Sequence, residues 1–112
     1  MKRISIYIAA LFLALTSPVL AGASPSPNQI DIKECMYSPD TLKVTAGTKV
    51  TWINRDDVPH TIVDSATPKM FHSAALDTND GYSFAFVKPG TYHYFCTLHP
   101  QMVGTIIVAA TP

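Results

Sequence analysis

The feature of this chain that most limits its fold is a series of short runs in which apolar and polar residues alternate. The first begins at Ile30, where Ile30 and Ile32 alternate with Asp31 and Lys33, and similar runs follow at 42–53, 81–96 and 104–109. A period of two, with many Val, Ile, Thr, Tyr and Phe residues, is typical of half-buried strands. Since residues 24–112 show no amphipathic helix of normal length, the pattern predicts an all-β, antiparallel sandwich.

Residues 81–96 and 65–80 differ from the other runs in the structure that they predict. Residues 81–96 predict a hairpin that turns at Pro89-Gly90, with Tyr92, Tyr94 and Cys96 on one face of the returning strand. Residues 65–80 have no clear period, so we expect them to be irregular.

The N-terminal segment has the order of a secretory signal. Lys2 and Arg3 precede the apolar run at 4–15, and small residues suited to cleavage after Ala21 or Ala23 come next. The apolar run is shorter than the roughly 20 residues that span a bilayer as a helix, although an uncleaved anchor is the alternative. We therefore expect a signal peptide at 1–23, a linker at 24–29, one domain at 30–112 without a membrane span, and a periplasmic or otherwise exported protein.

The charge of the expected mature chain excludes one class of partner. Without Lys2 and Arg3, six basic residues remain against eight acidic ones, a net charge of −2 with neutral histidines. A nucleic-acid-binding domain would need a clustered basic surface, so we expect no nucleic-acid partner.

Four side chains in two segments form a candidate metal site. Cys96, His99 and Met102 follow one another at intervals of three residues, and His60 stands in a Pro-preceded turn upstream. Two His, one Cys and a weak axial Met are the donors of a blue-copper electron-transfer site. Zinc is the competing metal, but Met is a poor zinc ligand.

The remaining candidate ligands receive other interpretations. Cys35 has only Cys96 as a possible disulfide partner. Because Cys96 is assigned to the metal site, we expect a free thiol at Cys35. His93 alternates with Tyr92 and Tyr94 and should point away from Cys96. His72 lies in the irregular segment, and both histidines are interpreted as surface residues.

The segments "CTLHPQM" and "KVTWINRDDVPH" give the chain a family resemblance. They resemble the small cupredoxins, and the spacing from Cys to Met is closest to that of amicyanins. The resemblance runs from Ile30 to about Val108 and implies a Greek-key β-sandwich of about eight strands with one type 1 copper ion. It assigns His60, Cys96 and His99 as equatorial ligands and Met102 as the axial ligand.

The chain departs from the family at two positions beside the ligands. Thr61 stands where many members have Asn, and a hydroxyl can make one bond to the Cys loop but not the full set of an amide. Leu98 stands where amicyanins have Pro.

The resemblance also implies a function. We expect a monomeric, non-enzymatic carrier that moves one electron at a time between periplasmic redox partners, such as a dehydrogenase or a c-type cytochrome, docking near His99. A periplasmic copper-binding protein for delivery or buffering is the alternative. It would use the same ligands, although the Met- or His-rich exposed segments typical of delivery proteins do not occur here.

Overall fold

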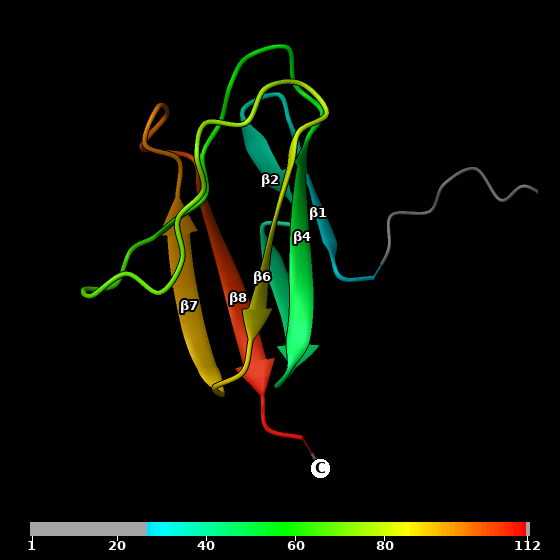
Figure 1. Ribbon diagram of the computed structural model, residues 1–112, viewed down its shortest axis with the longest axis vertical. Helices are drawn as coiled ribbons and strands as arrows, with labels where there is room; N and C mark the ends of the chain where they lie inside the picture. The colour runs from blue at the N-terminus through cyan, green and yellow to red at the C-terminus, as the bar shows by residue number, and fades with distance from the viewer. Residues whose placement is uncertain (1–26, 112) are drawn as a thin grey trace, which may run out of the picture.

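The computed structural model describes residues 27–111, which form eight strands and no helix (Figure 1). The expected signal peptide at 1–23 lies outside the described residues. The strands are β1 (Gln29–Lys33), β2 (Met36–Ser38), β3 (Thr41–Thr45), β4 (Thr48–Asn54), β5 (Val63–Asp64), β6 (Gly81–Phe86), β7 (Gly90–Phe95) and β8 (Val103–Ala109). This confirms the all-β fold.

The strands form two four-stranded sheets, one in the order β2-β1-β4-β6 and the other in the order β3-β8-β7-β5. The prediction of a purely antiparallel sandwich is wrong, because both sheets are mixed. In one sheet β1 pairs with β4 in parallel, and in the other β3 pairs with β8 in parallel. Both parallel pairs join strands that are not consecutive, since a parallel pair needs a crossover connection.

The predicted hairpin at 81–96 is wrong. β6 pairs with β4 in the first sheet and β7 pairs with β8 in the second, so the turn at Pro89-Gly90 crosses between the sheets. Alternation in the sequence gives the faces of a strand but does not identify its neighbour.

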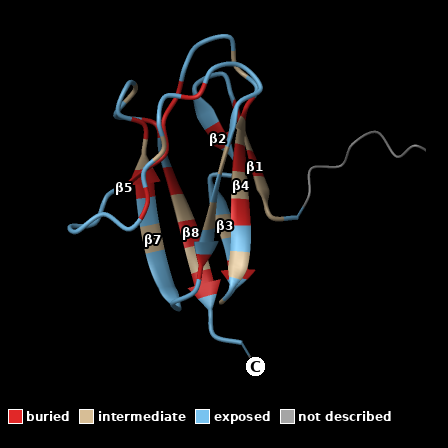
Figure 2. Cartoon of the chain, in the orientation of Figure 1, coloured by how far each residue is buried: buried red, intermediate tan, exposed pale blue. Residues whose placement is uncertain are grey.

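The core lies between the sheets and is formed by the apolar side of each strand (Figure 2). On β4 the fully buried Val50 and Trp52 alternate with the half-buried Thr51 and Ile53, as the pattern predicts. The Trp52 ring meets the Tyr94 ring edge-on, with 5.4 Å between centroids. Edge-to-face contacts of this kind add to the stabilisation from buried area.

Gly104 on β8 allows the second sheet to close over this core. It pairs with Tyr94 on β7, and a Cβ atom at position 104 would lie 2.2 Å from the Tyr94 ring. Only glycine leaves room for the ring, so this position holds β7 and β8 in register just before the loop that joins them.

Three connections gather at the end of the sandwich where β4 and β7 finish. These are the turn at 34–35, the loop at 55–62 and the loop at 96–102. The Arg55 N–H donates to Ile32 O at 2.7 Å, which ties the second connection to β1. Residues 27–111 hold no helix of a length and apolarity that would cross a membrane.

Candidate metal centre

The first part of the site is the loop at 96–102 between the paired strands β7 and β8. The Cys96 N–H donates to Met102 O at 3.1 Å, and the Met102 N–H donates to His99 O at 2.9 Å. These bonds close a tight loop directly beyond the last strand pair, Phe95 with Val103. The loop buries Cys96 and Met102 and leaves His99 half-buried.

His60 enters from the other connection and is held by backbone bonds. Its N–H donates to Leu76 O at 3.1 Å, and the Leu76 N–H donates to His60 O at 2.8 Å. The side chain is fully buried. The irregular segment at 65–80 thus contributes a bridge that fixes a candidate ligand.

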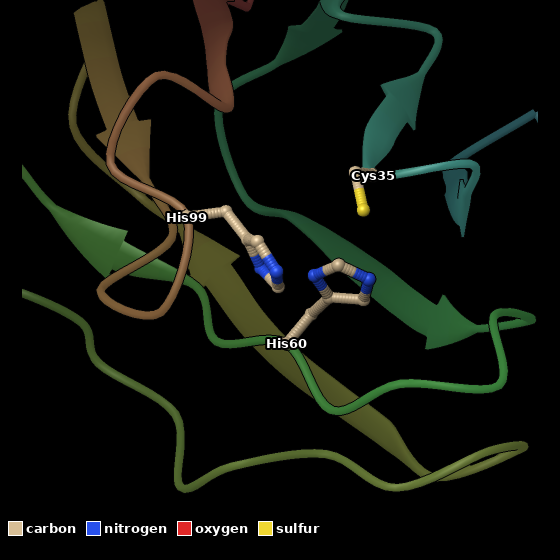
Figure 3. Close-up of side chains that lie close together, drawn as sticks. All are labelled: Cys35, His60 and His99. Carbon is tan, nitrogen blue, oxygen red and sulfur yellow. The ribbon is translucent and has the colours of Figure 1, made fainter.

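The two imidazoles and the Cys96 thiol converge on one point. Cys96 Sγ lies 3.8 Å from His60 Nδ1 and 3.7 Å from His99 Nδ1. Figure 3 shows the His60 and His99 rings facing each other from the two loops, with 4.8 Å between their centroids. In zinc sites metal–nitrogen bonds are about 2.0–2.1 Å and metal–sulfur bonds about 2.3 Å. Both Sγ–Nδ1 distances are shorter than the sum of one metal–nitrogen and one metal–sulfur bond. One ion of that size can therefore bridge Cys96 Sγ to either imidazole.

Asp56 orients the His60 ring, a role that no pattern in the sequence indicates. His60 Nε2 lies 2.9 Å from Asp56 Oδ2. A neutral imidazole that donates from Nε2 presents its Nδ1 lone pair, here toward Cys96. The His60 hydrogen bond, followed by one from the Cys35 N–H, lowers the pKa of Asp56 to about 2, so the carboxylate is charged at neutral pH.

Buried Asn54 in turn holds the chain around Asp56. Its Nδ2 donates to Val58 O at 2.9 Å and to Leu76 O at 2.8 Å, while its Oδ1 accepts from the Asp56 N–H at 2.9 Å. The loop that carries Asp56 and His60 is therefore fixed from within the sandwich.

Thr61 joins the His60 loop to the Cys96 loop by more hydrogen bonds than the sequence predicts. Thr61 Oγ1 accepts from the Thr97 N–H at 2.8 Å and lies 2.9 Å from Thr97 Oγ1. The Thr61 N–H donates to Cys96 Sγ at 3.4 Å. The expectation of a single bond is wrong, because the Thr97 hydroxyl and backbone supply the additional partners.

These contacts change the ionisation of the Cys96 thiol. Burial raises its pKa, but hydrogen bonds from Thr61, His99 and Leu98 lower it, and the net pKa lies below the usual value. A thiolate is the form that binds a metal ion, so the surroundings favour the reactive state of the side chain.

The predicted free thiol at Cys35 and the predicted exposure of His72 and His93 agree with the structure. Cys35 and Cys96 are both free thiols. His72 and His93 are exposed, and His93 Nδ1 lies 3.1 Å from Thr105 Oγ1 on the neighbouring strand.

Cys35 is the residue whose position the sequence did not reveal. Its Sγ and one ring nitrogen each of His60 and His99 all lie within 4.8 Å of one another (Figure 3). The Cys35 N–H donates to Asp56 Oδ2 at 3.0 Å. Partial desolvation, and then the nearby charges of Asp56 and Cys96, raise the pKa of this thiol. No spacing rule connects a turn at position 35 with histidines so far along the chain.

Comparison with known proteins finds related sequences and solved structures. The family model described as "Cupredoxin-like domain" matches residues 4–108. Amicyanin-alpha of Methylorubrum extorquens is 32% identical over 101 residues, which cover 85% of each chain.

Two solved structures have the same fold. The purple cupredoxin from Nitrosopumilus maritimus is 35% identical with a TM-score of 0.68, covering 72% of this chain and 98% of its own. The reduced state of an amicyanin mutant is 32% identical with a TM-score of 0.70, covering 80% and 88%.

Proposed function

This chain belongs to the cupredoxin-like family, and from that premise we propose that it is a soluble blue copper protein that carries one electron at a time between exported redox partners. The observation that supports this most directly is the convergence of His60 Nδ1 and His99 Nδ1 on Cys96 Sγ at 3.8 and 3.7 Å. We assign His60, Cys96 and His99 as equatorial ligands and Met102 as the axial ligand. The proposed role is that of a carrier and not of an enzyme.

The cofactor is one copper ion, in keeping with the family and the donors. When bound, copper supplies a couple of two oxidation states that differ by one electron. Thiolate and thioether donors suit Cu(I), and imidazole suits both states, so the mixed set tolerates either. Zinc would be served better by a carboxylate or a further Cys than by the buried Met102.

The surrounding residues keep the donors in place. Asp56 fixes the His60 ring, and the Thr61 N–H donates to Cys96 Sγ. The Tyr37 hydroxyl donates to Thr61 O at 2.7 Å and anchors this turn to β2. Ligands that are held from outside need to move little when an electron arrives or leaves, so this scaffold favours rapid transfer.

An apolar surface beside His99 is the proposed docking site. Leu98, which is 51% exposed, and the exposed Pro100 are the residues on either side of half-buried His99. A small uncharged patch suits the weak, short-lived complexes of redox proteins. We propose that a dehydrogenase or a c-type cytochrome docks here, and that the carrier is monomeric and periplasmic or otherwise exported.

The proposed docking site is tested by the rate of electron transfer from the reduced protein to a c-type cytochrome. Leu98→Glu should slow the bimolecular rate because it places a charge in the patch. Val87→Glu is the matched control, since Val87 is 70% exposed but lies between β6 and β7, at the opposite end of β7 from the ligand loop. Equal rates for Leu98→Glu and Val87→Glu would exclude this face.

A further inference from the structure

The exposed thiol of Cys35 faces the same two imidazoles as Cys96. Cys35 occupies the two-residue turn between β1 and β2, where Glu34 and Cys35 have φ of 53° and 56°. The Cys35 N–H on Asp56 Oδ2 fixes this turn against the carboxylate that orients His60. As a result, three side chains of ligand type place their donor atoms within 4.8 Å of one another.

The two donors that belong to the inner site alone, Cys96 and Met102, are difficult to reach from solvent. Cys96 is fully buried and Met102 is 6% exposed. The shared His60 is also fully buried, but one of its ring nitrogens lies within 4.8 Å of Cys35 Sγ. Of the ligand-type side chains at this end of the described chain, Cys35 is exposed and His99 is half-buried. A metal ion that approaches from solvent therefore meets the Cys35 thiol and the His99 ring before it can contact Cys96.

A pocket lies beside the site, between the turn at 34–35 and the loop at 96–102. Its volume is about 160 Å³, and Cys35 on the turn and Met102 in the ligand loop both contribute to its wall. An exposed thiol and a buried thioether thus border one continuous space. Both are soft donors that prefer Cu(I).

We infer that Cys35, His60 and His99 form an outer Cu(I) site through which copper reaches the inner donors. The inference rests on the proposed function because it shares the two histidines with the inner site. On loading, Cys35 loses its thiol proton as its sulfur binds Cu(I). On transfer inward, the bond from Cys35 sulfur to Cu(I) breaks, a bond from Cys96 sulfur forms, Cys96 releases its proton and Cys35 takes one up. No electron is transferred in either step.

The outer site is isolated by removing the inner thiol. Apo-protein carrying Cys96→Ser is titrated anaerobically with Cu(I) in competition with the chromophoric chelator bicinchoninate. It should bind one Cu(I), and addition of either Cys35→Ser or His99→Ala should weaken binding at least about tenfold, because loss of even a group that only supports a metal ligand costs that much. An affinity that does not change with Cys35→Ser, or that depends on Cys35 but not on His99, would overturn the site, because Cys35 would then be absent from it or an isolated surface thiol.

A second measurement keeps Cys96 in place and does not depend on the folding of that variant. Stopped-flow mixing of apo-protein with the Cu(I)–bicinchoninate complex gives the loading rate. Cys35→Ser should slow loading at least about tenfold, in proportion to the affinity lost from the entry site, whereas Met70→Ser, which removes a sulfur that is 48% exposed in another loop, should load like the parent. Equal rates for Cys35→Ser and the parent would overturn the inference. Failure of the proposed function is a separate result: the oxidised, copper-loaded parent would lack a blue absorption.

Discussion

Thr61→Val tests whether the hydroxyl of Thr61 holds the two metal-binding loops together. Valine keeps the shape of threonine and the backbone N–H on Cys96 Sγ, but it removes the acceptor for the Thr97 N–H at 2.8 Å and the partner of Thr97 Oγ1 at 2.9 Å. A lost hydrogen bond costs about 0.5–1.5 kcal/mol, and a buried donor without a partner costs about 1–3 kcal/mol. Thr97 is exposed, so water can take the place of the lost partner. We therefore expect Thr61→Val to lower the free energy of unfolding by about 1–2 kcal/mol, the lower part of the range for a donor without a partner.

The assay is urea unfolding of the metal-free protein, since a bound metal would add its own stabilisation. A loss of about 1–2 kcal/mol corresponds to about a 5- to 30-fold shift in the folding equilibrium. Thr51→Val is the matched control, because Thr51 Oγ1 pairs with Ser83 Oγ at 2.8 Å on the exposed side of β4 and β6. Such a cross-strand pair contributes at most about 1 kcal/mol. If Thr61→Val is no more destabilising than Thr51→Val, the hydroxyl does not join the loops.

Three further outcomes are expected. Gly104→Ala should destabilise the protein by about 1–3 kcal/mol, measured by thermal unfolding, because the new Cβ would lie 2.2 Å from the Tyr94 ring; a loss under about 1 kcal/mol would contradict this packing. Met102→Gln should keep copper and lower the reduction potential, measured by voltammetry, because an amide oxygen favours Cu(II); complete loss of copper would contradict the axial role. The pKa of Asp56 is about 2, below its usual 3.8, so its contribution to stability is complete above about pH 4 and is lost as pH falls toward 2. The difference in urea midpoint between the parent and Asp56→Asn should therefore shrink over that range, and a constant difference would refute the assigned charge.

The sequence predicts the faces of the strands better than their neighbours. Val50 and Trp52 are buried as their alternation indicates, because burial of apolar side chains is a local consequence of the period. The strand that pairs with β6 cannot be predicted from the residues close to β6 in the sequence. Phe86 and Gly90 are separated by one short turn but belong to different sheets, and the Phe86 strand pairs with β4.

The residues of the candidate site that lie close together in the sequence could likewise be predicted, whereas those in separate loops could not. Cys96, His99 and Met102 lie in one loop, so their spacing alone predicts that they are neighbours, and the soft donors indicate the metal. Asp56 and Cys35 were missed because their roles depend on how separate loops pack. Nothing in the sequence indicates that an aspartate in one turn accepts a hydrogen bond from a cysteine in another. The contact forms because the two turns lie at the same end of the sandwich.

The optical spectrum of the oxidised, copper-loaded protein tests the central claim most directly. Charge transfer from the Cys96 thiolate to Cu(II) should give an intense blue absorption with one copper per chain, and Cys96→Ser should abolish it. A parent that binds no copper, that gives only a pale complex, or whose blue band survives in Cys96→Ser would contradict the assignment of this site.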